Sequence, residues 1–232
     1  MTGNWREFWD RPHRIYVNDR HLGVHYARVA DDFLSELPEK PGVVLDYGCG
    51  DALDAERVAA RCARLLLCDS APSVRAALAR RFRDNQRVSV LGPEDVAELP
   101  EAKLDLVVAN SVLQYLSREE CKDFLVTIRP KLAPGGRLIL ADVVLPGGGI
   151  VADVSSLLST GLRNGFLFAA LAGLAQSFVS DYRRLRHEVG LTIYEENEMR
   201  ALLESLGYTT ERRARNFGFN RRRMTFIARP SN

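Results

Sequence analysis

Two short apolar runs that each end in an aspartate, joined by a glycine turn, set the narrowest limit on how this chain folds. The first run, Val43 to Asp46, leads into the turn at Tyr47 to Ala52, and the second, Leu65 to Cys68, leads into Asp69. Between them, Leu53 to Ala63 carries apolar residues at helical spacing. A strand, a tight turn, a helix and a second buried strand are typical of a parallel α/β unit.

The turn and the two acids predict a ligand that contains a nucleoside. Gly48 and Gly50 leave no side chain between the backbone and a ligand. The following helix offers unpaired amide donors at its N-terminus. An acid at the end of the second strand, here Asp69, is where such folds bind ribose hydroxyls.

The spacing of the glycines decides against a dinucleotide. Counting from Gly48 and Gly50, the third position of the dinucleotide pattern falls on Leu53, which fails the requirement for glycine or alanine. A nicotinamide oxidoreductase is therefore the disfavoured alternative. Asp46, next to the glycine pair, places a carboxylate beside the ligand, which suits a cationic group better than a pyrophosphate.

These residues resemble the first two motifs of the class I S-adenosylmethionine-dependent methyltransferases, with Ala52 where many members have a third glycine. The resemblance implies S-adenosyl-L-methionine as cofactor and S-adenosyl-L-homocysteine as product. It places Asp46 near the methionine moiety, Asp69 near the ribose, and Asp95 and Val96 near the adenine, and it implies that Ser70 also binds the cofactor. The other implied cofactor-binding residues are Tyr47, Gly48, Cys49 and Gly50 in the turn, and Asn110 and Ser111 beside the methyl group.

The rest of the chain continues the alternation of strands and helices. We predict strands at Val88 to Leu91, Leu104 to Ala109 and Arg137 to Val144, with a loop at Gly92 to Pro100. The fold class is therefore α/β: a seven-stranded, mainly parallel Rossmann-like methyltransferase sheet. We expect a single domain over 1–232, with N-terminal lid helices at 1–41, a cofactor-binding core at 42–145, an inserted helical cap at 146–190, and a C-terminal helix and β-hairpin at 191–232.

Composition limits the partners and the compartment. A chain of 232 residues with 46% hydrophobic content can bury one substantial core, and a net charge of +2 does not by itself point to a nucleic acid partner. The four cysteines form no metal-binding pattern, so no metal is expected, and the start shows no secretory signal, which favours the cytoplasm. The uncharged run Asn164 to Ser180 is too short and too polar to span a bilayer; it could line an apolar pocket, pack on a partner or touch a membrane surface.

The acceptor is expected to be a small apolar or amphipathic molecule. Alternatives are a lipid or quinone at a membrane surface, a nucleic acid bound by the basic C-terminal hairpin, and a regulator that binds cofactor without turnover. The absence of an Asn/Asp-Pro-Pro-Tyr signature argues against a nucleic acid base. Displacement at a sulfonium needs mainly alignment and desolvation, so a general base is optional; His25 and Tyr16 are the candidates.

Overall fold

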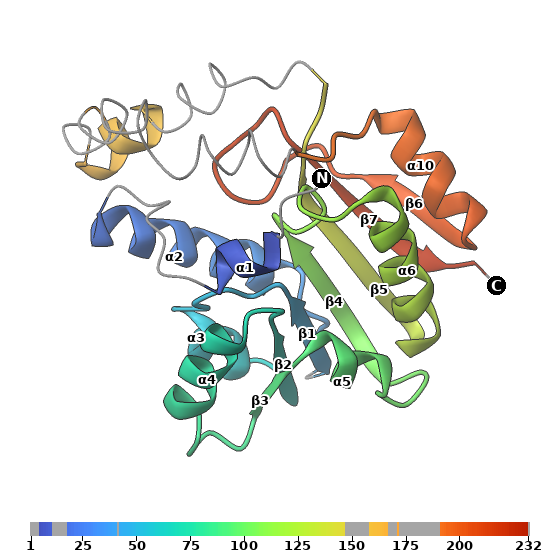
Figure 1. The fold of residues 1–232 in the computed structure, drawn as a ribbon, viewed down its shortest axis with the longest axis horizontal. Coiled ribbons are helices and arrows are strands. Elements are labelled where there is room, and N and C mark those ends of the chain that lie inside the picture. Colours follow the sequence, from blue (N-terminus) through green and yellow to red (C-terminus); the bar gives the residue numbers. More distant parts are fainter. Residues whose placement is uncertain are drawn as a thin grey trace.

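A seven-stranded sheet forms the centre of the computed structural model, which describes residues 5–10, 18–40, 42–146, 158–166, 171 and 191–231. The strand order is β3-β2-β1-β4-β5-β7-β6 (Figure 1). The first five strands pair in parallel, and β7 runs antiparallel to both β5 and β6. The strands are β1 Val43–Tyr47, β2 Arg64–Cys68, β3 Val88–Leu91, β4 Leu104–Asn110, β5 Leu132–Val143, β6 Tyr208–Arg212 and β7 Met224–Pro230. The predicted α/β fold class is confirmed.

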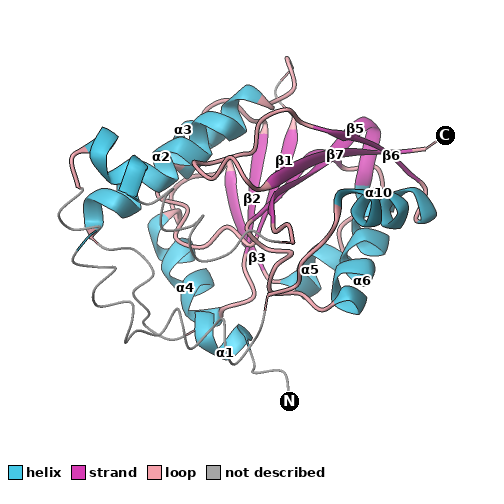
Figure 2. Cartoon of the chain, turned by 90° about the horizontal axis from the view of Figure 1, so that it is seen from above, coloured by secondary structure: helices cyan, strands magenta, loops and turns pink. Residues whose placement is uncertain are grey.

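Helices cover both faces of the sheet (Figure 2). The described helices are α1 Trp5–Trp9, α2 Asp19–Ser35, α3 Ala55–Ala59, α4 Pro72–Arg81, α5 Pro93–Ala97, α6 Arg118–Ile128 and α10 Glu196–Ser205, with a 3-10 turn at Arg129–Lys131 and a helical segment at 158–164. Neighbouring strand residues point to opposite cores: Val44 packs with Phe33 of α2, whereas Leu45 packs with Leu125 of α6. This two-sided burial explains why the central strands read as continuous apolar runs.

Three predicted boundaries are wrong, each for a local reason. The helix expected over 53–63 is reduced to the five residues of α3, because the chain turns at Ala60 to Cys62 to enter β2. The loop expected at 92–100 contains α5, which Pro93 begins and the Asp95 carboxylate caps by accepting from the Gly92 amide at 2.7 Å. The fifth strand begins at Leu132, which pairs with Leu104, rather than at Arg137.

The N-terminal helices and the cap are only partly described. Helices α1 and α2 form where the lid was expected, and Asn18 caps α2 by accepting from the His21 amide at 2.9 Å. Of the expected cap, only 158–166 and Leu171 belong to the described residues. Among the helices that the structure describes, none combines the length and apolar character that a membrane span requires. The domain boundaries stay predictions.

Candidate functional site

The site lies where the strand order reverses, because β1 pairs with β2 on one side and with β4 on the other. In open parallel sheets ligands bind outside the carboxyl ends of the strands at this point. Here the chain leaves β1 through a turn in which Gly48, Gly50 and Ala52 all have positive φ, at 78°, 54° and 42°. The amides of Gly48 and Cys49 both donate to the Cys68 carbonyl, at 2.8 and 3.0 Å, which fastens the turn to the end of β2.

Side chains of the protein itself explain why both glycines are needed. A Cβ on Gly48 would lie 2.4 Å from Cγ2 of Val112, and a Cβ on Gly50 would lie 2.8 Å from the hydroxyl of Tyr26. The absence of a side chain at these two positions therefore serves the packing of the protein itself as well as a ligand. The structure shows that the loop after β4 and helix α2 also close on the turn.

Replacing Gly48 by alanine should lower the free energy of unfolding by about 2 kcal/mol, because both a left-handed backbone and a contact with Val112 oppose the new methyl group. Gly135 offers a matched control, since its φ is +80° and nothing lies within 4 Å of its Cβ position. Gly135→Ala should show only the stability loss caused by the left-handed backbone. Adding Val112→Ala to Gly48→Ala should recover part of the stability that Gly48→Ala loses. Chemical denaturation measures all three; equal losses for both glycine variants would contradict the steric part.

Asp69 follows β2 and holds the turn with both of its carboxylate oxygens. Oδ2 accepts from the Gly50 amide at 3.0 Å, and Oδ1 accepts from the Ala71 amide at 2.9 Å. Arg75 fixes the backbone at this point by donating to the carbonyls of Asp69 and Ser70. Burial raises the pKa of Asp69, and the two amide donors oppose that rise. Each oxygen keeps a further lone pair for a ligand hydroxyl.

Asp46 lies one strand away and is partly buried at the end of β1. Within the described residues, no donor lies within hydrogen-bond distance of its carboxylate. Burial, followed by the negative charge of Asp69, raises the pKa of Asp46 to about 7. A cation bound beside these two acids would offset both the burial of the Asp46 charge and its repulsion by Asp69, so the site is electrostatically suited to a positively charged group.

The two residues expected near the adenine, Asp95 and Val96, both lie on α5. Asp95 is exposed on α5, with one carboxylate oxygen engaged by the Gly92 amide. Val96 is buried at 1% exposure, and its amide donates to the Gly92 carbonyl at 3.2 Å. The Val96 amide is therefore already used within α5. The adenine role of these two residues stays a prediction.

Ser111 begins a polar network at the carboxyl ends of β4 and β5. Its hydroxyl donates to Oδ2 of Asp142 at 2.9 Å, and both residues have left-handed backbones, with φ of 59° and 60°. The Asp142 amide donates to Oδ1 of Asn216, whose side-chain nitrogen returns a hydrogen bond to Oδ1 of Asp142 at 3.3 Å. Strained non-glycine backbones are uncommon and concentrate at functional sites. Asp142 and Asn216 were missed, although Asp142, like Asp46, follows an apolar run.

Of the two catalytic candidates, only His25 belongs to the described residues. Tyr16 lies outside the described residues. His25 is on α2, where burial and then the charge of His21 lower its pKa to about 4, which leaves a neutral but weak base. Its neighbour Tyr26 contacts the turn, because the Tyr26 hydroxyl accepts from the Asp51 amide at 2.9 Å.

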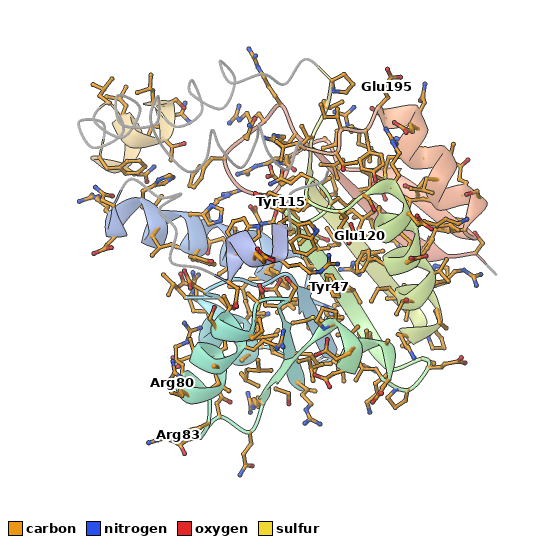
Figure 3. All side chains as sticks on the ribbon, viewed as in Figure 1. Tyr47, Arg80, Arg83, Tyr115, Glu120 and Glu195 are labelled. Carbon is orange, nitrogen blue, oxygen red and sulfur yellow. The ribbon has the colours of Figure 1, made fainter. Side chains whose placement is uncertain are left out.

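Helix α1 bridges the two sides of the site. Trp9 contacts Tyr115 of the loop after β4 edge to face, with ring centroids 5.3 Å apart. Figure 3 labels Tyr115. Asp10 accepts from the Ser73 amide at the start of α4, at 2.9 Å, and Arg6 pairs with Glu120 of α6 at 2.8 Å. Tyr47 lies on the α6 side, with its ring 4.6 Å from that of Phe124. The α1 contacts thus connect helices on opposite faces of the sheet.

The known sequences that are similar to this chain include several methyltransferases. Residues 45–138 match the family described as a methyltransferase domain. The uncharacterized methyltransferase Rv0089 of Mycobacterium tuberculosis is 34% identical over 125 residues, 53% of this chain and 60% of that protein. The tRNA 5-carboxymethoxyuridine methyltransferase of Escherichia coli is 30% identical over 115 residues, 47% of this chain and 43% of that protein. The chain thus spans less than two thirds of the length of these curated relatives.

Solved structures share the fold. The 1,6-didemethyltoxoflavin-N1-methyltransferase of Burkholderia thailandensis superposes with a TM-score of 0.57, covering 92% of this chain and 83% of that one at 21% identity. At this level of identity the likeness concerns the arrangement of the sheet and its helices. It therefore supports the architecture and leaves the acceptor open.

Proposed function

Because this chain carries the methyltransferase domain on the class I S-adenosylmethionine-dependent methyltransferase fold, we propose that it transfers a methyl group from S-adenosylmethionine to a small, apolar or amphipathic acceptor. The family resemblance read from Asp46, Gly48, Gly50 and Asp69 is confirmed. The activity of the whole protein and the identity of its acceptor belong to the proposal. The Burkholderia protein was crystallised with S-adenosylhomocysteine, which supports the same cofactor here.

The observation that carries the proposal is the pair of acids at the switch point. Asp46 is a partly buried carboxylate without a donor among the described residues, and Asp69 stands at the end of the adjacent strand β2. An ammonium or sulfonium group would complete the electrostatics of Asp46, and ribose hydroxyls would complete the hydrogen bonding of Asp69. A pyrophosphate would add negative charge to a site that is already negative.

The residues around the carboxyl end of β4 favour an amphipathic acceptor. Polar groups gather on the loop after β4: the Ser111 hydroxyl contacts Asp142, and the side-chain oxygen of Gln114 accepts from the buried Arg223 at 3.1 Å. Aromatic rings lie on the same loop and on neighbouring elements: Trp9 of α1 contacts Tyr115 of the loop, and His21 of α2 stacks on Phe166 with ring centroids 5.0 Å apart. A molecule with one polar end and one apolar body would match both surfaces.

The bound cofactor supplies an electrophilic methyl group, and the chain's residues align and shelter it. Helix α1, held to α4 and α6, is placed to exclude water, which favours displacement at a charged centre. An acceptor hydroxyl or amine can donate to the Ser111 oxygen while Ser111 donates to Asp142. This arrangement orients the attacking atom without requiring His25 as a base.

The proposal is tested by labelling. With methyl-labelled S-adenosylmethionine and fractionated cell extract, we expect saturable binding and transfer of the label to a small-molecule fraction.

Binding of a nicotinamide dinucleotide instead would support the disfavoured alternative, a nicotinamide oxidoreductase. Saturable cofactor binding with no label in any fraction would support a non-catalytic regulator. Label in extracted membrane lipid would identify a membrane-surface acceptor, for which the exposed Leu162 is a candidate contact.

A tRNA acceptor is the second candidate, because the Escherichia coli relative is named for a tRNA substrate. The arginines of the C-terminal hairpin give it limited support, since three of the six from Arg212 to Arg223 are ion-paired or buried. Arg212 pairs with Glu196, Arg213 pairs with Glu36, and Arg223 is 7% exposed. Arg215, Arg221 and Arg222 remain exposed. Label in the tRNA fraction together with strongly salt-dependent RNA binding would favour this candidate.

A further inference from the structure

The glycine turn is held from two sides by residues that belong to different helices. From α4, Arg81 donates to the carbonyl of Asp51 at 2.8 Å and to that of Ala52. From α2, the Tyr26 hydroxyl accepts from the Asp51 amide at 2.9 Å and lies 2.8 Å from the position that a Cβ of Gly50 would take. The peptide groups of this strained turn are thus fixed by side chains distant in sequence.

Helix α2 also contacts the helical segment at 158–164 and the residues that follow it. Arg20 donates to the carbonyl of Asn164 at 2.6 Å, and its guanidinium lies against Gly165. One residue further along α2, His21 stacks on Phe166, which is 4% exposed. Tyr26 stands only about 9 Å along the helix axis from Arg20, at 1.5 Å per residue.

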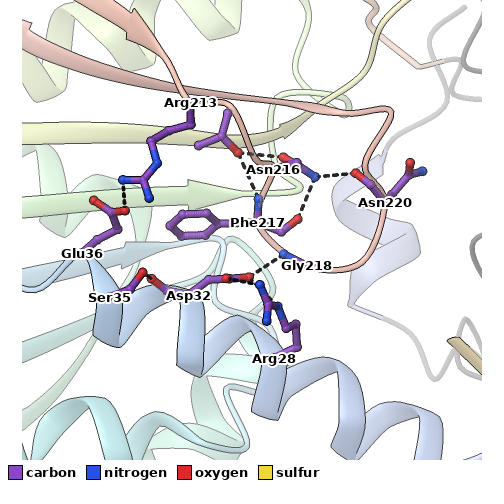
Figure 4. A network of polar contacts seen from close by, with 10 residues as sticks. Arg28, Asp32, Ser35, Glu36, Arg213, Asn216, Phe217, Gly218 and Asn220 are labelled. Carbon is purple, nitrogen blue, oxygen red and sulfur yellow. Dashed lines mark hydrogen bonds and ion pairs between the residues drawn. The ribbon is translucent and has the colours of Figure 1, made fainter. Parts of the chain in front are cut away.

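The other end of α2 is fixed to the loop between β6 and β7 (Figure 4). Asp32 accepts from the Gly218 amide at 2.7 Å and pairs with Arg28 at the same distance. Arg213 pairs with Glu36, which follows α2 and is buried at 4% exposure. Because a helix moves as a unit, a displacement of α2 at the turn would also be felt at Asn164 and Phe166.

We propose that Tyr26 is a positioning residue that couples the cofactor turn to the 158–166 segment through α2. It holds the turn in the shape that binds the cofactor, and cofactor binding in return stabilises the docked position of α2. Coupling of this kind is reciprocal, so each event strengthens the other. The inference rests on the proposed function, because the turn must be the cofactor site.

The test uses S-adenosylhomocysteine as the probe and Tyr26→Phe as the variant. Loss of one neutral hydrogen bond should weaken binding about fivefold in calorimetry. In the wild type, the probe should slow amide exchange in both α2 and the 158–166 segment, and Tyr26→Phe should lose most of the slowing in that segment. Tyr208→Phe is the matched control: its hydroxyl donates to the Leu125 carbonyl at 2.7 Å inside the core, so the substitution removes a similar bond and should leave probe affinity unchanged.

The outcomes separate the two proposals. Wild-type protein that fails to bind the probe would overturn the proposed function. Wild-type protein that binds it, with Tyr26→Phe binding equally well, would overturn the positioning role. Unchanged exchange in the 158–166 segment of the wild type, or equal slowing in the variant, would overturn the coupling. A comparable loss of affinity in Tyr208→Phe would show that general destabilisation explains the effect and would overturn the inference as well.

Discussion

Asp69→Ala should weaken the binding of S-adenosylhomocysteine by about 30- to 150-fold, equivalent to roughly 2 to 3 kcal/mol. Two losses add. The variant loses the charge-assisted hydrogen bonds expected with the ribose hydroxyls, and it releases the Gly50 and Ala71 amides that the carboxylate now holds at 3.0 and 2.9 Å. The turn would therefore be less well organised before the ligand arrives. Calorimetric titration of the purified variant measures the effect.

Asp69→Asn is the control for shape. The asparagine keeps one carbonyl oxygen at nearly the same place, so it should recover part of the affinity that alanine loses. Both variants need a circular dichroism spectrum like that of the wild type for the comparison to apply. A folded Asp69→Ala that binds the ligand as tightly as the wild type would refute the role of this residue.

Cofactor binding should depend on pH through Asp46. Its pKa in the folded protein is about 7, and only the ionised carboxylate attracts a cation. Affinity should therefore rise about fivefold between pH 6 and pH 7, as the ionised fraction rises from about one tenth to about one half. Measurements stop at pH 7 because the ligand's own amino group titrates near pH 8. Asp46→Asn should bind about tenfold more weakly at pH 7, with little change over this range.

The ionised form of Asp46 should also lower the stability of the folded protein when no ligand is bound. The pKa of Asp46 is higher in the folded protein than the 3.8 of a free side chain, so the folded state holds this proton more tightly than the unfolded state does. The contribution to stability is therefore complete below about pH 4 and is lost as the pH rises to about 7. Without ligand at pH 8, Asp46→Asn should melt several degrees above the wild type. A lower melting temperature for the variant would contradict the raised pKa.

Local spacing was enough to predict that Asp69 lies beside the glycine turn. The acids and glycines of the turn lie close in sequence, and their order along two neighbouring strands already places Asp69 beside the turn. The helix expected over 53–63 is longer than the observed α3, because hydrophobic spacing cannot show where the chain must bend to reach the next strand. Gly92 and Asp95 carry a signal for a helix start, because the Asp95 carboxylate caps α5; a glycine and proline loop at the same positions is the other interpretation of this pattern.

Contacts between distant residues could not be predicted. Tyr26 meets the Asp51 amide across 25 positions, and Ser111 meets Asp142 across 31. Both depend on how a helix or a strand end docks, which no local pattern specifies. The hairpin arginines show the same limit: adjacent residues in the sequence point to Glu196 and Glu36 on different elements, so the expected basic cluster is divided.

The most direct test of the cofactor site is a crystal structure of the protein with S-adenosylhomocysteine. We expect the ribose hydroxyls within hydrogen-bond distance of Asp69 and the ligand's ammonium group beside Asp46, at the turn formed by Gly48 and Gly50. A nucleoside bound away from this turn, or a pyrophosphate bound in it, would contradict the account.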